Sequence, residues 1–134
     1  MAKVSGLGAA IAVDDSAGAV KTISNDITNW GMATPRGVQD VTGVDKSAIE
    51  RLLLLADFSV DLTGVFNAAV GLSHDVFKTV PSTSVARTVT ITVATKVLAG
   101  ELLFSDYKVT RSASGELTWQ APGVLADGST PVWA

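Results

Sequence analysis

The chain has 134 residues, 47% of them hydrophobic and 17% charged, and this apolar balance predicts one domain over residues 1–134 with part of its surface against other subunits. Its formal net charge is −3, its ten basic residues are scattered and cysteine is absent, which argues against a duplex-binding surface and excludes disulfides and thiolate metal sites. No apolar stretch approaches the roughly 20 residues that span a bilayer, so we expect no membrane partner.

Valine and threonine occur eighteen and fourteen times, whereas tyrosine and histidine occur once each. Because β-branched side chains fit a pleated strand better than a helix, we expect a mainly β fold. Residues 9–13 and 19–24 predict the two strands of a hairpin around an Asp-Asp-Ser turn. An extended segment follows at 27–33, and the Pro-Arg-Gly sequence at 35–37 predicts a turn before a strand at 38–42.

The middle of the chain changes its hydrophobic period. Asp45 is placed to cap a short helix over residues 46–51, with Ile49 on its apolar side. The apolar run at 52–55 then leads into residues 57–64, where polar and apolar side chains alternate. That alternation is typical of a strand with one face in water and the other in a core.

A second helix is predicted over residues 73–79. Ser73 is a suitable N-cap, and its replacement by Ala should cost about 1 kcal/mol. Asp75 lies in the first turn, where the helix dipole favours an acid, and Pro81 ends the helix. We expect Phe77 to pack against the sheet.

Three further strands are predicted at 84–94, 101–110 and 115–121, the last two joined by a polar turn as in a β-meander. Alternate side chains of the predicted strands supply one apolar layer, formed by Phe58, Val60, Leu62, Val89, Ile91, Val93, Leu117 and Trp119. The expected architecture is therefore a β-sandwich or incomplete barrel with one short packed α-helix.

The opposite faces of the same strands are polar and lack positive charge. They carry Asp57, Ser59, Asp61, Thr63, Thr88, Thr90, Thr92, Glu116, Thr118 and Gln120. Two interpretations stay open, an ordinary solvent face of a sandwich and the lining of a channel. Such a wall would repel phosphate groups, whereas Lys and Arg would hold them.

Residues suited to catalysis are few. The one histidine, His74, begins the second helix without a nucleophile motif, and we expect it to be exposed and not catalytic. Asp14 and Asp15 lack the later acidic residue of a calcium loop. Asp57 and Asp61 would lie about 13 Å apart on a strand, too far for glycoside hydrolysis. We therefore expect a protein without enzyme activity, cofactor or metal.

Several segments together resemble one protein family. They are VTG at 41–43, DKSAIER at 45–51, DLTGVFN at 61–67, the Thr-rich segment at 84–94 and GELTWQAPG at 115–123. In their pattern and order, over most of the chain, they resemble the major tail tube protein of phages with long, non-contractile tails.

The resemblance implies a structural virion protein of the tail, made in the cytoplasm of a host bacterium, which the lack of cysteine also suits. Its copies would form rings, usually of six, stacked into a tube through which DNA leaves the capsid, with their sheets joined into a continuous inner barrel. The implied partners are other copies, the tape measure, terminator and distal tail proteins, and viral DNA passing without sequence-specific binding.

The resemblance also favours the channel interpretation of the polar faces. Contacts between rings are expected near the N-terminus, the Pro35 region and the C-terminal tail. The candidate residues for these contacts are Val4, Leu7, Pro35, Arg36, Val132 and Trp133.

Two other functions remain open. A different virion component, such as a tail terminator or a head decoration protein, could share the β-rich composition. A carbohydrate-binding β-sandwich is the third reading, although three tryptophans and one tyrosine offer few exposed rings for stacking.

Overall fold

The computed structural model describes residues 3–134 and is mainly antiparallel β, as predicted. The strands of the main sheet are β1 (Ala10–Asp14), β2 (Val20–Thr22), β3 (Ile27–Ala33), β6 (Ser59–Val65), β7 (Arg87–Val93), β8 (Lys96–Phe104), β9 (Lys108–Arg111) and β10 (Leu117–Leu125). A second, two-stranded sheet consists of β4 (Arg36–Asp40) and β5 (Arg51–Ala56). The helical elements are a 3-10 turn, η1 (Ser24–Asp26), and one α-helix, α1 (Ser73–Phe77).

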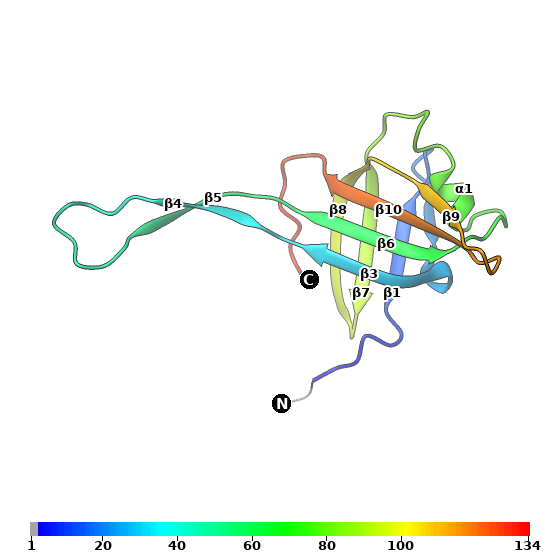
Figure 1. Cartoon of the computed structure of the whole chain (residues 1–134), viewed down its shortest axis with the longest axis horizontal. Helices are drawn as coiled ribbons and strands as arrows, with labels where there is room; N and C mark the ends of the chain where they lie inside the picture. The colour runs from blue at the N-terminus through cyan, green and yellow to red at the C-terminus, as the bar shows by residue number, and fades with distance from the viewer. Residues whose placement is uncertain (1–2) are drawn as a thin grey trace.

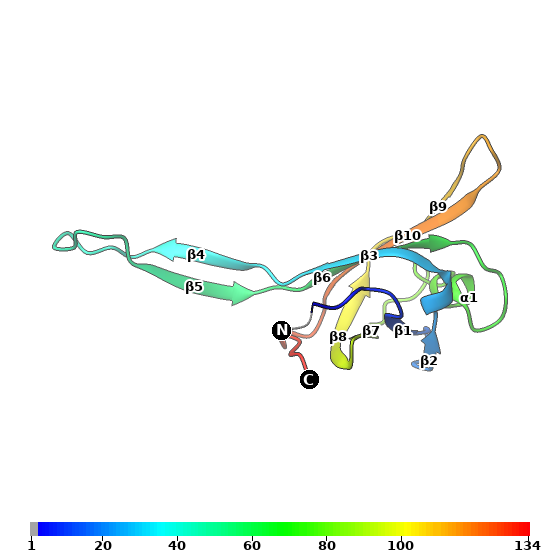
Figure 2. The same cartoon turned by 90° about the horizontal axis from the view of Figure 1, so that it is seen from below.

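The main sheet folds over on itself into two layers. Its strand order is β2-β1-β7-β8-β10-β6-β3, with β9 beside β10. We call β3, β6, β9 and β10 the front layer and β1, β2, β7 and β8 the back layer (Figure 1). Strand β10 joins them, because its last residues pair with β8 while its first residues pair with β9. Figure 2 shows the two layers from below.

The sheet is not closed into a barrel, since the end strands β2 and β3 do not pair with each other in the described residues. The predicted core is largely confirmed. The buried members are Phe58, Val60, Leu62, Val89, Ile91 and Trp119. Val93 is only partly buried, and Leu117 is 37% exposed because β10 begins beyond the covered part of the sheet.

Gly64 shows how tightly this core is packed. A Cβ atom at this position would lie 2.0 Å from the carbonyl oxygen of Asp26 and 2.8 Å from the Trp119 ring. The Trp119 indole nitrogen donates to the Val65 carbonyl at 2.9 Å. Glycine therefore lets β6 approach both η1 and the largest core side chain.

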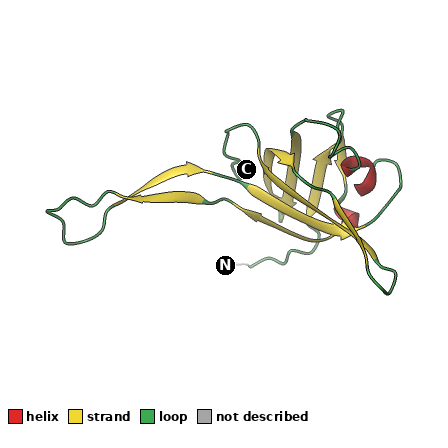
Figure 3. Cartoon of the chain, turned by 45° about the horizontal axis from the view of Figure 1, so that its top comes forward, coloured by secondary structure: helices red, strands yellow, loops and turns green. Residues whose placement is uncertain are grey.

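Helix α1 closes the end of the sandwich near β9 (Figure 3). Phe77 is fully buried, which confirms its prediction, and its ring centroid lies 5.1 Å from those of Phe104 and Trp119. The predicted cap is wrong, because Leu72 holds the N-cap position and the Ser73 hydroxyl is buried without a partner.

A distant carboxylate replaces the predicted cap. The Ser73 amide donates to Asp26 Oδ2 at 3.0 Å, and Asn67 Nδ2 donates to Asp26 Oδ1 at 2.9 Å. Asp26 thus satisfies a helix N–H that has no partner within the helix. At the other end, the Arg87 guanidinium donates to the Val76 carbonyl and to Thr79 Oγ1, and burial lowers the pKa of Arg87.

Two predicted elements between β3 and β6 are wrong. Residues 41–50 contain no helix, and the apolar run that follows forms β5, because pairing with β4 satisfies its backbone groups. The predicted turn at 35–37 is also absent, since only Thr34 and Pro35 separate β3 from β4.

The predicted strand at 101–110 is in fact divided between β8 and β9. Strand β8 begins earlier, at Lys96, after a tight turn in which Ala94 and Thr95 have φ angles of 48° and 70°. Without glycine or asparagine at these positions, the sequence gives no signal for that turn.

Candidate assembly arm and channel surface

A hairpin arm, residues 36–56, projects from one end of the sandwich (Figure 1). It is formed by β4 and β5, which pair from Arg36 opposite Ala56 to Asp40 opposite Arg51. The arm prolongs β3 and β6 beyond the point where the back layer ends (Figure 2). Its side chains therefore have no second layer of this chain to cover them.

Both faces of the arm are apolar. Leu53 and Leu55 lie on one face with Val38, because Val38 is the cross-strand neighbour of Leu53. Leu52 and Leu54 lie on the other face. The exposed fraction is 93% for Leu55, 59% for Leu53 and 56% for Leu52. Monomeric soluble proteins rarely expose such a patch, so this surface is suited to contact with another protein.

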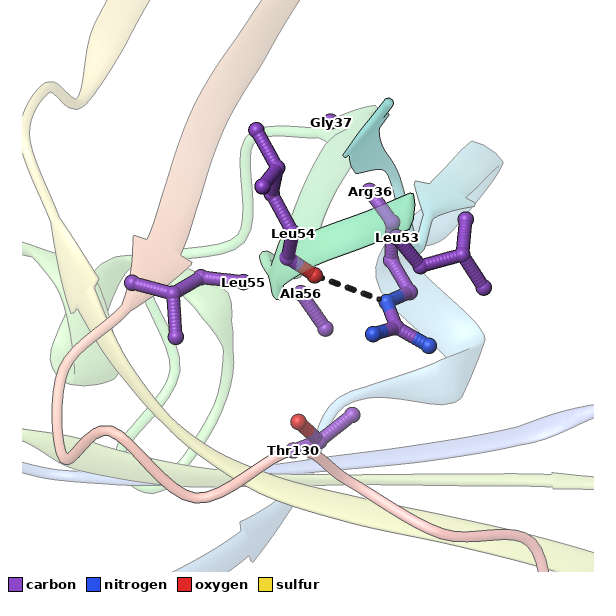
Figure 4. A pocket seen from close by; sticks show the side chains of 7 residues that line it. All are labelled: Arg36, Gly37, Leu53, Leu54, Leu55, Ala56 and Thr130. Atoms are coloured by element: carbon purple, nitrogen blue, oxygen red, sulfur yellow. Dashed lines mark hydrogen bonds between the residues drawn. The ribbon is translucent and has the colours of Figure 1, made fainter. Parts of the chain in front are cut away.

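The base of the arm contains a bulge and an open groove. Where the ladder shifts register after Arg36, the Arg36 Nε donates to the Leu54 carbonyl at 3.0 Å. The groove has a volume of about 930 Å³ and lies between the arm and Thr130 of the C-terminal segment. Figure 4 shows its lining, in which the side chains of Leu53, Leu54 and Leu55 form the main apolar part.

The tip of the arm, residues 40–50, carries three acidic residues and one lysine, next to the exposed Val44 and Ile49. Asp40 accepts hydrogen bonds from the Thr42 hydroxyl at 2.6 Å and the Thr42 amide at 2.9 Å, and these bonds lower the pKa of Asp40. Lys46 forms an exposed ion pair with Glu50 at 3.8 Å. The tip therefore stays anionic at neutral pH and has a defined turn.

The outward face of the front layer brings several predicted channel residues together. Thr63 lies between Gln120 and Asn29 in the sheet, and these residues line one shallow depression with Asp61. Ser59 and Thr118 share this face by strand alternation. The face presents amide, hydroxyl and carboxylate groups to the outside.

The margins of this face differ from the predicted pattern. Asp57 precedes β6, and its carboxylate accepts a bond from the Phe58 amide at 2.8 Å. Glu116 lies in the turn before β10, where Ser114 donates to it. Lys108 lies opposite Gln120 in β9, so a cation that the sequence pattern did not indicate borders the polar face.

The threonines of β7 lie elsewhere. Thr88, Thr90 and Thr92 alternate with the buried Val89 and Ile91, so they face outward from the back layer. The Thr88 hydroxyl donates to Glu101 of β8. Because the core separates the two layers, these threonines and the front-layer group belong to two different surfaces.

The residues expected at contacts between rings lie at the surface of the molecule. Leu7 is 90% exposed and Val132 77%, and Val4 and Trp133 are also exposed. The backbone of Ala134 pairs with Val97 of β8, which holds the C-terminal segment on the body. Pro35 and Arg36 lie at the base of the arm.

His74 is partly buried and packs against aromatic side chains. Its prediction as an exposed residue is wrong, because the ring lies 4.6 Å from Phe66 and its Nδ1 is 3.1 Å from the Tyr107 hydroxyl. Burial raises the pKa of Tyr107.

Residues 3–134 contain no group of three acidic or histidine side chains placed to hold a metal. No helix in this part of the chain is long and apolar enough to cross a membrane.

The apolar side chains of the arm are the functional candidates that the sequence pattern missed. Four successive leucines at 52–55 in a strand place apolar groups on both faces, which indicates cover on both sides. The neighbouring cap signal at Asp45 favoured a helix instead, in which the leucines would have joined one core.

No protein family model matches this chain, and no curated protein matches it by sequence. Solved structures do match. One is a chain in the tail of an empty gene transfer agent particle, computed with helical refinement and C6 symmetry, with 17% identity and a TM-score of 0.79 over 98% of this chain and 99% of that chain. Another is a chain of the native gene transfer agent virion, with 15% identity and a TM-score of 0.78 over the same shares. The chain therefore has the fold of these proteins.

Proposed function

We propose that this chain is a structural, non-enzymatic subunit of a phage-like tail tube, in which rings of six copies stack into a conduit for DNA. The observation that carries the proposal is its likeness, over nearly its whole length, to a protein in a particle tail with C6 symmetry. Its place would then be the virion tail. Its partners would be other copies and the tape measure, terminator and distal tail proteins.

The exposed leucines of the arm support the proposal that copies of this chain assemble. Fully burying one leucine is worth roughly 1.5–3 kcal/mol, so covering both faces of the arm would supply a large part of an assembly contact. In a free subunit these leucines stay in water and do not stabilise the protein. In an assembly, neighbouring copies would cover them and gain the free energy of their burial.

The front layer is the better candidate for the channel wall. It continues directly into the arm, so its polar face adjoins the surface that we propose for contacts between copies. Its free edges, β3 and β9, have no further strand beside them in the described residues. Joining such edges between copies would close a sheet around the channel and remove exposed edges that otherwise aggregate. The back-layer threonines would then lie outside the channel.

Electron microscopy of the purified full-length chain tests the proposal. We expect hollow tubes of stacked rings as the concentration rises. Assembly should persist at high salt, because screening weakens exposed ion pairs far more than apolar contacts. Single rings would instead favour a tail terminator, and protein that stays monomeric would contradict the proposal.

A lysine substitution tests the channel wall. In assembled tubes, Asp61→Lys should retain short double-stranded DNA that wild-type tubes release, because a cation binds phosphate. The matched control is Thr90→Lys on the back layer, which should bind DNA only outside the tube. A reconstruction that places Asp61 on the outer wall would reject this assignment.

A further inference from the structure

The end of the molecule opposite the arm also projects. Strands β9 and β10 form a second hairpin, residues 108–120, which extends away from the sandwich (Figure 2). On one face of it, Val109 is 42% exposed and Leu117 37% exposed. Arg111 is the cross-strand neighbour of Leu117 and shares that face. The hairpin therefore offers a small apolar surface bordered by a cation.

The two projecting ends carry opposite charge. The tip of the arm has three carboxylates, Asp40, Asp45 and Glu50, against the single Lys46, a formal net charge of −2. Residues 108–116 have Lys108 and Arg111 against the single Glu116, a net charge of +1. Neither of these two cations is in an ion pair within the described part of the chain.

We propose that the arm of one copy docks on the β9–β10 hairpin of another copy. The carboxylates of the arm tip would face Arg111, and the arm leucines would cover Val109 and Leu117 on the same face of the hairpin. Lys108 lies on the opposite face beside Gln120 and adds to the positive charge of the hairpin. The inference rests on the proposed function, because it needs a chain that assembles with itself.

Symmetry gives a reason to prefer this pairing to arm against arm. A contact between two identical surfaces is satisfied in a closed dimer, whereas a contact between two different ends repeats from copy to copy, and either closes into a ring or continues as an open polymer. The arm and the hairpin lie at opposite ends of the long axis, so each docked copy leaves one free end for the next.

Charge reversal tests the pairing. The tip-reversed variant carries Asp45→Lys and Glu50→Lys, and the hairpin-reversed variant carries Lys108→Glu and Arg111→Glu. Alone, each should raise the concentration needed for polymerisation on the order of tenfold or more, because like charges then meet. Mixed in equal amounts, the two should assemble near the wild-type concentration, since each tip again meets an opposite charge.

The control is Lys21→Glu with Lys96→Glu on the back layer, which changes the net charge by the same amount as the hairpin reversal and should leave assembly unchanged. Pelleting and negative-stain microscopy give the readout. Either reversed variant assembling like the wild type, or a mixture that shows no rescue, would overturn the pairing.

A second measurement separates this inference from the proposed function. Sedimentation of the two reversed variants at low concentration should show a mixed dimer that neither forms alone. Tubes without a mixed dimer would retain the proposed function and reject the pairing. A mixed dimer from a protein that never forms tubes would support the pairing and reject the proposed function.

Discussion

Leu62 in the sandwich and Leu55 in the arm are seven positions apart in the sequence, yet one is fully buried and the other is 93% exposed. Leu62 points into a core shared by two layers, whereas Leu55 belongs to a hairpin with no second layer. The apolar content of this chain therefore serves two purposes. In the body it stabilises the fold, and in the arm we propose that it serves contacts with other copies.

The largest effect on the isolated subunit should come from the core. Leu62→Ala should lower the free energy of unfolding by about 2–5 kcal/mol, because it leaves a cavity in a packed interior. Leu55→Ala should change it by less than about 0.5 kcal/mol, as for other exposed positions. Urea unfolding of monomeric protein measures both. Equal losses would abolish the distinction between body and arm.

The arm should show the opposite behaviour in assembly. Leu53→Ser with Leu55→Ser should raise the concentration needed for polymerisation on the order of a hundredfold, because two apolar side chains leave a buried contact. The melting temperature of the subunit should not change. Val70→Ser is the control, since Val70 is 92% exposed but lies outside the arm. An equal effect of Val70→Ser would show that exposed apolar residues act unspecifically.

The N-terminus of α1 is capped by Asp26 and not by the Ser73 side chain. Asp26→Ala should cost about 1–3 kcal/mol, because it leaves the buried Ser73 amide and the Asn67 side chain without their acceptor. Ser73→Ala should be close to neutral, since that hydroxyl has no partner to lose. Chemical denaturation measures the free energy of unfolding of both variants. A larger loss for Ser73→Ala than for Asp26→Ala would show that Ser73 caps the helix.

The smallest effect should come from Asp75. Hydrogen bonds from Lys78 at 2.7 Å and the Gly71 amide at 3.0 Å lower its pKa below the ordinary value of 3.8. A carboxyl whose pKa is lower in the folded state stabilises that state above its unfolded pKa, and the contribution is lost as the pH falls through the folded pKa. Asp75→Asn should therefore flatten the acid side of the stability curve slightly. An unchanged slope would contradict this.

The body could be predicted where local pattern and tertiary packing agree. Alternation located β6 and β7, and the second helix was confirmed because its apolar side faces the sheet. The Asp26 cap could not be predicted, since it joins positions 47 residues apart in the chain. The division between β8 and β9 was also missed, because the pairing of β10 with both of them is a tertiary effect.

The residues predicted to line a channel show the same limit. Alternation identified polar faces correctly, but one strand pattern cannot say which layer of a sandwich it will join. Asp61 and Gln120 meet on the front layer because β6 pairs with β10. Thr90 has the same alternation on the back layer. In the arm, a capping signal in the sequence competed with strand pairing, and the pairing of β4 with β5 prevailed.

The most direct test compares the full-length chain with an armless one by electron microscopy and sedimentation. Residues 37–55 would be replaced by an Asn-Gly turn, which suits a two-residue hairpin between the paired Arg36 and Ala56. We expect tubes from the full-length chain, and folded monomers with an unchanged melting temperature from the armless one. Tubes from the armless chain, or its failure to fold, would contradict the division between a self-sufficient body and an arm used for assembly.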